Sequence, residues 1–443
     1  MSILTILKNA FKNNDERNKE LIDRVNKDTK KFKPIKPDGV RIGYDVLYTS
    51  PNIALINTAS RLCVGMNPNK TYEEQKAQVG RMSNRNHWSV FEHSNVIVVL
   101  YFNKGAVDGS ILLDIAEILS NAKYCNVKVS ETKSRYNILI GGSSRAFGHI
   151  LLETNPNNSL INTIKVIMET SFEKEILIPY IRLGLLNENL CTYVPSNPDK
   201  MDIKTMVGDR VNLLWADPVD YIYTKAKKFG FSMKDIYDVS IISFLFHDIS
   251  RACYDQMARH RNAISTESQR YVQHKTGYVS FIDPFDIVDY PDIDEDTRHR
   301  IHSMDPFYIY SFALKSGLKK EDARAWLPMN AKIRSAMTFT YSYLSHFIQL
   351  RSDKSAQSEV QLVSKEINKY VDNVINKTII DTKKEKEFNG KISTLHKYNN
   401  YDNYFVINNV DETTEEADND VIVDDETSIP EPMDVEKIAN QIK

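Results

Sequence analysis

The sequence predicts an α+β fold, in which a mixed or antiparallel sheet is flanked by helices. The apolar run 96–102 (VIVVLYF) is strongly β-prone and is typical of a buried strand. Residues 40–50 also begin like a strand, and Pro51 then marks the start of the helical pattern NIALINTASRLC. Further along, apolar residues at helical spacing in 344–348 and 360–367 predict a pair of packed helices.

The composition is ordinary for a globular protein, but the charge is unevenly distributed. Of the 443 residues, 42% are hydrophobic and 26% are charged, which allows two or three domains. The segment 411–436 contains twelve acidic residues and no Lys or Arg, so in the rest of the chain 57 basic residues face 47 acidic ones. This basic body favours an anionic ligand or nucleic acid as the partner.

Cysteine spacing and hydropathy indicate a cytoplasmic protein. The four cysteines, at positions 63, 125, 191 and 253, are far apart and form no CxxC pair, which indicates a reducing compartment and predicts no metal site. The run 96–102 is far too short to span a bilayer, so we expect no contact with a membrane.

Changes in apolar pattern and polarity along the chain predict an arm, an interrupted core and a tail. Residues 1–37 start with a short helical stripe and then become polar, as expected for an N-terminal arm. We expect the core to consist of residues 38–102 and 239–383, interrupted by a large, mostly helical insertion over 103–238. Residues 384–443 turn polar and then acidic, and we expect a disordered tail there.

Charged residues are concentrated in residues 250–271 (SRACYDQMARHRNAISTESQRY), which hold four arginines. Arginine presents a rigid fork of donors that fits phosphate oxygens, so Arg259, Arg261 and Arg270 suit a phosphorylated ligand near Ser268. The alternative is a solvated, salt-bridged helix face. The stretch has too few acidic residues to pair with all these arginines, which favours the ligand site.

A second polar cluster precedes the strand expected at 96–102. The segment NHWSVFEH places His87, Ser89, Glu92 and His93 at the mouth of this strand, where ligand-facing groups commonly lie. A lone histidine at such a position is usually structural. Two histidines that flank a glutamate leave the structural and the functional role equally open.

Three separated blocks together resemble the flavin-dependent thymidylate synthase family. The central block RHRNAISTESQRY is similar to the family signature, Arg-His-Arg followed at a fixed distance by Ser and then Arg-Tyr. The upstream block NHWSVFEH is similar to the family's Gly-His-x-Ser/Thr-x-x-Glu-His element, and EDARAWLP, LSHFIQLR and AQSEV are similar to its downstream elements. The blocks follow the family's order and cover residues 40–102 and 240–380.

The resemblance implies a role for residues in each block. The residues expected to hold the substrate dUMP are Gln256, Arg259, Glu267, Ser268, Arg270, Arg324 and Arg351. The residues expected to contact the cofactor FAD are Ser89, Glu92, Arg259, His260, Arg261 and His346. The implied catalytic residues are Arg351, Ser268 and His87, the last near the flavin where folate stacks. A guanidinium such as Arg351 can stabilise negative charge that develops on the uracil carbonyls.

The resemblance also implies the reaction and the assembly. The family transfers a methylene group from methylenetetrahydrofolate to dUMP, and FADH2 that is regenerated by NADPH provides the reduction. The flavin carries the hydride, and the protein positions and polarises the substrate. The family's active sites are shared between the subunits of a homotetramer, so we expect a thymidylate synthase-like fold in such an assembly.

The central block departs from the family in its spacing. Six residues instead of the usual seven separate Arg261 from Ser268, so the alignment of Thr266 and Glu267 is ambiguous. Asn86 replaces the usual glycine of the upstream block.

The flavin contacts also depart from the family. Thr340 and Ser342 stand where an Asn-x-Arg pair often contacts the flavin. The segment SSRAFGHILLE echoes the downstream helix, so Arg145 and His149 could supply the lost contacts.

Three other functions stay open. His247-Asp248 together with His87 and His93 would suit a metal-dependent phosphohydrolase, but further ligands are needed. The basic body with Tyr271 and Tyr278 would suit a nucleic-acid-binding protein. Against this function, the arginines cluster in one stretch of the sequence and do not form the long basic stripe typical of such proteins. The third is a weakened relative that still binds nucleotide and flavin. The other class of thymidylate synthase needs a nucleophilic cysteine, typically after proline, and no cysteine here follows proline; we interpret Cys253 as a packed helix residue.

Overall fold

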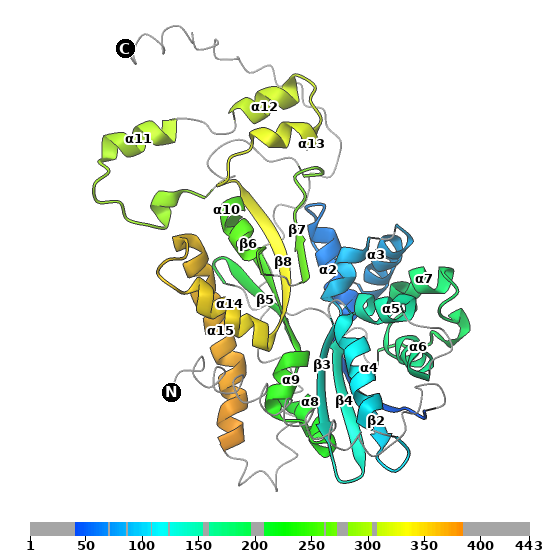
Figure 1. Ribbon diagram of the computed structural model, residues 1–443. Coiled ribbons are helices and arrows are strands. Elements are labelled where there is room, and N and C mark those ends of the chain that lie inside the picture. The colour runs from blue at the N-terminus through cyan, green and yellow to red at the C-terminus, as the bar shows by residue number, and fades with distance from the viewer. Residues whose placement is uncertain are drawn as a thin grey trace. The chain divides into compact units, whose positions relative to one another are not determined.

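The protein contains two four-stranded antiparallel sheets with helices packed around them, so the predicted α+β class is confirmed (Figure 1). The structure is a computed structural model. It describes residues 40–69, 71–85, 87–107, 109–122, 125–153, 159–195, 208–260, 263–272, 282–303 and 308–383. The N-terminal arm and the acidic tail expected from the sequence lie outside the described residues.

The two sheets have the same strand order. The first, β1-β2-β4-β3, consists of β1 (Gly43–Thr49), β2 (Val96–Asn103), β3 (Cys125–Glu131) and β4 (Arg135–Gly142). The second, β5-β6-β8-β7, consists of β5 (Val211–Ala216), β6 (Ile241–Ser250), β7 (Ala263–Thr266) and β8 (Lys332–Thr340). We call residues 43–153 the first repeat and residues 211–351 the second repeat.

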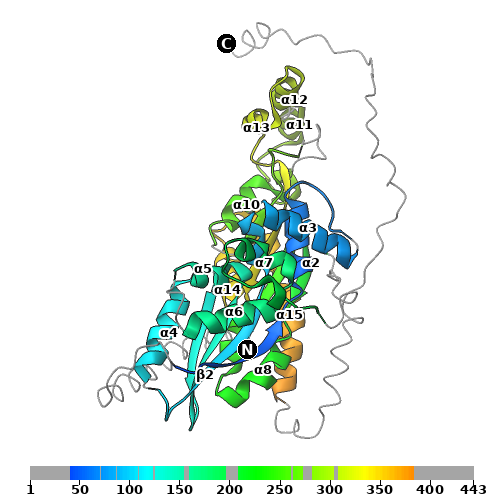
Figure 2. The same ribbon diagram turned by 90° about the vertical axis from the view of Figure 1, so that its right-hand side faces the viewer.

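Helices connect and cover the strands. Those of the first half of the chain are α2 (Asn52–Leu62), α3 (Tyr72–Asn84), the 3-10 helix η1 (Trp88–His93), α4 (Gly109–Asn121), α5 (Ser144–Glu153), α6 (Ser159–Ser171), α7 (Lys174–Arg182) and η2 (Glu188–Leu190). Those of the second half are α8 (Val219–Ala226), η4 (Lys227–Phe229), α9 (Met233–Val239), α10 (Arg251–Met257), η6 (Pro284–Asp286), α11 (Glu295–Ser303), α12 (Tyr308–Lys315), α13 (Lys320–Ala323), η7 (Arg324–Trp326), α14 (Tyr341–Arg351) and α15 (Ser358–Lys383). Figure 2 shows α5, α6 and α7 together on one side of the first repeat.

The repeats also agree in strand register. In β1 the pairing with β2 shifts at Leu47, and in β5 the pairing with β6 shifts at Leu214, two residues before the strand ends in each case. Pro51 and Pro218 then stand directly before α2 and α8. A proline fixes its own φ at a value that suits a helix start, so both strands lead into a helix at the same point.

The first sheet is buried on both faces. Val98 of β2 belongs to the core formed with helices of the first half, whereas Ile97 and Val99 belong to a core that includes Phe244 of the second sheet. A strand buried on both faces needs apolar residues at every position, which explains the unbroken run over 96–102. The second core joins the two repeats.

The segment 103–238 differs from the helical insertion that we expected. It contains the expected helices α4 to α7, but β3 and β4 in the same range complete the first sheet, and β5 begins the second. The apolar run of β4, residues 138–140, lacks the period of two because both faces of the strand are buried. Because this alternation is missing, the sequence pattern did not indicate the strand.

No helix among the described residues is both long and apolar enough to cross a membrane.

Candidate functional site

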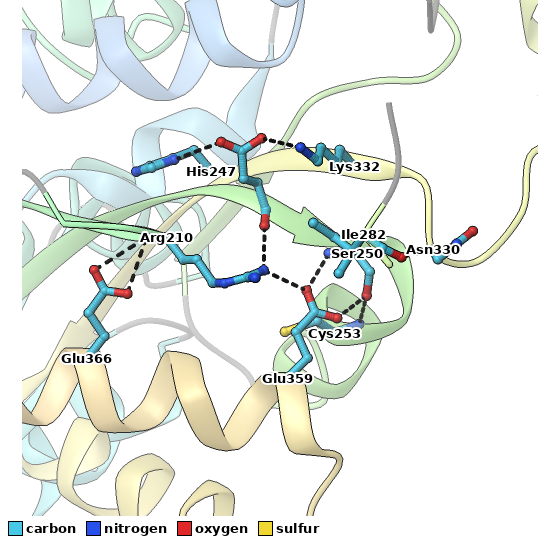
Figure 3. A network of polar contacts seen from close by, with 10 residues as sticks. Arg210, His247, Ser250, Cys253, Ile282, Asn330, Lys332, Glu359 and Glu366 are labelled. Carbon is cyan, nitrogen blue, oxygen red and sulfur yellow. Dashed lines mark hydrogen bonds and ion pairs between the residues drawn. The ribbon is translucent and has the colours of Figure 1, made fainter. Parts of the chain in front are cut away.

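The arginine-rich stretch begins where β6 passes into α10, and α15 fixes this point. Ser250 is the N-cap of α10, and its hydroxyl accepts a hydrogen bond from the Cys253 amide at 2.9 Å. The Glu359 carboxylate of α15 accepts a bond from the Ser250 amide at 2.7 Å and lies 3.9 Å from the Arg210 guanidinium (Figure 3). A buried carboxylate thus holds the start of α10 and so positions the residues that follow along it.

Arg351 connects the ends of α10 and α14. Its Nε donates to His260 Nε2 at 2.8 Å, and its terminal nitrogens donate to Gln256 Oε1 at 3.1 Å and to the Gln256 carbonyl at 2.7 Å. Burial and, to a smaller extent, the positive charge of Arg259 lower the pKa of Arg351. Two guanidinium groups held near each other repel, and a bound anion relieves that repulsion.

His260 orients Arg351 as a neutral ring. It is buried and packs against the Phe347 ring at 4.8 Å, with Tyr343 and His346 further around it. Burial, followed by the charges of Arg351 and His346, lowers the pKa of His260 to about 4. An unprotonated Nε2 can accept the Arg351 Nε–H, so His260 acts as a hydrogen-bond acceptor near neutral pH.

The loop after β7 holds three further predicted residues. The Glu267 carboxylate accepts bonds from the Arg334 guanidinium at 3.4 and 3.5 Å. The Ser268 amide donates to the Cys63 carbonyl of the first repeat at 2.9 Å, and the Ser268 hydroxyl accepts a bond from the Arg270 amide at 3.4 Å. Both repeats therefore anchor this loop.

Arg324 lies in an open cavity of 680 Å³. The cavity is lined by residues of α10, η7 and the loop after β7, among them Arg251, Gln269 and Arg324. Arg251 also pairs with Asp255 at 3.2 Å. Arginines from separate segments thus converge here, partly balanced by acidic residues.

The element η1 of the first repeat packs on β7 and β8 of the second. The ring nitrogens of the buried His93 lie 2.8 Å from Thr338 Oγ1 and 3.0 Å from Ser265 Oγ. Burial lowers the pKa of His93 to about 3, so this ring is neutral and structural. The buried Glu92 carboxylate pairs with the Arg145 guanidinium of α5.

The predicted site residues fall into three groups. Arg351, Gln256 and His260 are in direct contact, Arg259 lies close enough to affect Arg351, and His346 lies near His260. Glu267, Ser268 and Arg270 share one loop, whereas Arg324 lies with Arg251. At the start of η1, His87, which precedes the helix, and Ser89 within it are exposed, and Glu92 pairs with Arg145. Arg261 lies outside the described residues.

Sequence reasoning missed several residues that build the site. Arg334 binds Glu267, and Glu359 holds the start of α10. Glu359 stands within the matched block AQSEV, so the motif contained it without indicating its role. No pattern in the sequence indicates that Cys63 contacts Ser268, because these segments are far apart in the chain and only the fold brings them together.

The described residues support neither a metal site nor a thiol nucleophile. His247 lies 3.4 Å from Asp248 and 3.2 Å from Asn212, and no group of three or more His, Cys, Asp or Glu residues among the described ones could hold a metal. Cys253 is buried in α10, and this burial raises the pKa of its thiol well above the usual value.

The fold and the site define an α+β protein whose second sheet carries an arginine-rich site suited to an anionic ligand. Residues 232–375 match the family described as thymidylate synthase complementing protein. The match lies within the second half of the chain and includes α10 and α14.

Curated relatives match this chain over a similar number of residues. The flavin-dependent thymidylate synthases of Thermococcus onnurineus and Pyrococcus abyssi are 28% and 30% identical to this chain over 138 residues. The corresponding protein of Pyrococcus furiosus is 28% identical over 138 residues. These segments make up 30% of this chain and 56% of each relative, so the chain spans about half the length of the curated relatives it matches.

Proposed function

We propose that the protein is a flavin-dependent thymidylate synthase that converts dUMP to dTMP. The observation that carries the proposal is Arg351, held by Gln256 and His260 and lying near Arg259, inside the segment that matches the family. Methylenetetrahydrofolate would supply the one-carbon unit, and NADPH would supply the reducing equivalents. The curated relatives carry the flavin-dependent name, which supports FAD as the cofactor here.

The substrate would be held by charge and polarised by a fixed guanidinium. Ser268 and the exposed Arg270 lie in one loop and would bind the 5′-phosphate of dUMP. Arg351 would lie against the uracil, where it stabilises negative charge on a carbonyl oxygen. Its bonds to Gln256 and His260 hold the guanidinium in one orientation before substrate arrives, so little reorganisation is needed.

The residues present are chemically suited to hold FAD, which would supply the hydride when bound. Arg259 is exposed near Arg351, and its guanidinium suits a phosphate group of FAD. His346 is exposed on α14, next to His260. Ser89 and Glu92 of the first repeat, together with Arg261, would complete the set.

Assembly and location are parts of the same proposal. The family resemblance implies a homotetramer with shared sites, but one chain here already contains two repeats. Because each chain contains two sheets, two chains would bring four sheets together, and a mass of twice 51.0 kDa in solution would distinguish such a dimer from a tetramer of chains. We also expect a cytoplasmic enzyme.

The proposal is tested by rescue of a thymidine-requiring bacterium. The full chain should restore growth without thymidine, and Arg351→Ala should abolish the rescue, because loss of one charge-stabilising donor lowers turnover by about 100-fold or more. Gln349→Ala changes an exposed neighbour on the same helix and should rescue normally. Failure of the unaltered chain, expressed in soluble form, would refute the activity.

A weakened relative is the second candidate, because Ser342 stands in place of the expected arginine and its hydroxyl bonds to Asp238. A purified protein that binds flavin and dUMP but fails to rescue growth would support this alternative.

A further inference from the structure

The two repeats agree in register but differ in chemistry at equivalent positions. Gly142 pairs with Val96 in the first sheet, as Phe339 pairs with Ile242 in the second. When the two repeats are aligned on these strand pairs, residues at the same aligned position are equivalent. Arg145 aligns with Ser342, Glu92 with Asp238, and His149 with His346. The local structure agrees, because Ser143 and Thr340 cap α5 and α14 by accepting the amides of Ala146 and Tyr343.

A direct contact between equivalent residues supports this alignment. Ser50 and Asp217 both directly precede the proline that leads into the next helix, and the Ser50 hydroxyl donates to Asp217 Oδ1 at 2.7 Å. Equivalent residues of two related units touch each other only near the two-fold axis that relates the units. The repeats are therefore packed as a pseudo-symmetric pair within one chain.

Each repeat keeps an acid at the same place but gives it a different partner. Asp238 of the second repeat bonds to the Ser342 hydroxyl and to Lys128 Nζ, the latter at 2.6 Å. In the first repeat, Glu92 pairs with Arg145 of the equivalent helix. The first repeat thus retains a guanidinium where the second repeat has a hydroxyl.

Arg145 lies in a built site. The Glu92 side chain is 7% exposed, whereas Arg145 keeps 26% of its side chain accessible, so a buried carboxylate holds a partly exposed guanidinium. Ser89 stands three residues before Glu92 in a 3-10 helix and so lies on the same face. His149 follows Arg145 by one helical turn and shares its side of α5.

Aromatic residues pack against the helix that carries Arg145. The Tyr180 ring lies 5.5 Å from the Trp88 ring, and its hydroxyl donates to the Ser144 carbonyl at 3.1 Å. A Cβ at Gly148 would lie 2.1 Å from the Tyr180 ring, so only glycine allows this close packing on α5. The backbone that carries Arg145 is therefore closely packed against these rings.

We infer that the two repeats have divided one active site between them. The second repeat binds the nucleotide through the group around Arg351, and the first repeat binds a phosphate-bearing ligand through Arg145, with Ser89 and His149 beside it. Under the proposed function, on which this assignment of the ligand rests, the ligand is the flavin cofactor. Each chain then binds one flavin, because Ser342 of the second repeat offers no equivalent charge.

The test is a titration of the purified full chain with FAD, and separately with inorganic diphosphate. We expect one FAD per chain and, in Arg145→Ala, an affinity lower by about tenfold or more, since a hydrogen bond to a charged group is lost. Ser342→Ala changes the equivalent residue and should bind FAD as the unaltered chain does. Because Arg145→Ala removes the arginine that pairs with the buried Glu92 carboxylate, the pair Arg145→Met with Glu92→Gln serves as a second variant, checked for an unchanged thermal midpoint.

Each outcome decides the question. Unchanged FAD binding in both Arg145 variants, or two FAD per chain, would overturn the division of the site. If FAD does not bind but diphosphate does, and Arg145→Ala weakens it, the proposed flavin function fails and the phosphate site in the first repeat stands. If neither ligand binds the unaltered chain, the inference is wrong.

Discussion

The two repeats of this protein share a backbone and differ in the segments that carry chemistry. In the first repeat a tight turn over residues 132–134 joins β3 to β4. In the second repeat the equivalent strands β7 and β8 are separated by residues 267–331, which include Ser268, Arg270 and Arg324. The register of the strands follows from apolar residues and turn positions, whereas these three proposed substrate-binding residues lie in the long connection that only the second repeat has. Such a comparison separates what builds the fold from what builds the site.

The largest effect on stability is expected where the repeats meet. The Asp217 carboxylate is buried and accepts bonds from the Ser50 hydroxyl at 2.7 Å, the Ile241 amide at 2.8 Å and the Trp215 indole at 2.9 Å. Asp217→Ala leaves these donors without their acceptor, so we expect the free energy of unfolding to fall by about 3 kcal/mol in urea titrations.

The matched control for this variant is Asp209→Ala, because Asp209 is exposed. It should change the free energy of unfolding by less than about 0.5 kcal/mol. Equal effects of the two substitutions would mean that the Asp217 contacts do not join the repeats energetically.

A smaller effect on stability is expected from His93. This residue of the first repeat contacts the second repeat, and the equivalent position of the second repeat is Val239. Burial lowers its pKa from 6.5 to about 3 in the folded protein, so between these values the unfolded chain binds a proton that the folded chain does not. The contribution of His93 is full above pH 6.5 and falls as the pH is lowered toward 3, by at most about 1.4 kcal/mol per pH unit.

The measurement compares His93→Gln with the unaltered chain by urea unfolding at about pH 7 and about pH 5. The destabilisation caused by the substitution should shrink at the lower pH, because the unaltered chain has by then lost part of the histidine's contribution. His260, whose pKa is lowered to about 4, titrates in both proteins and cancels in the difference. A destabilisation that is the same at both pH values would contradict the neutral, buried state of His93.

Much of the second repeat could be predicted from the sequence. The motif RHRNAISTESQRY and the helix LSHFIQLR placed Arg259, His260 and Arg351 in one site, and the structure brings the last two into contact. The apolar spacing of α14 and α15 also gave the correct helices. These features depend on local sequence, which is why they were accessible.

The pairing of the repeats could not be predicted in the same way. Equivalent strands contain different residues at equivalent positions; for example, Phe244 of β6 stands where β2 has Val98. The pairing register of the strands is therefore the same in both repeats, although their sequences are not similar. The motif NHWSVFEH was assigned to the same core as the arginines, although it belongs to the first repeat and reaches the second through His93. From the sequence, the likeness of SSRAFGHILLE to the downstream helix was interpreted as a source of replacement flavin contacts, and no duplication was predicted.

Under the proposed function, the second repeat alone carries the nucleotide site, and calorimetric titration of the purified chain with dUMP measures this. We expect one dUMP per 51.0 kDa chain, binding at least about tenfold weaker in Arg351→Ala, and unchanged binding in Gln349→Ala. Two dUMP per chain, or equal affinity in Arg351→Ala and the unaltered protein, would contradict it.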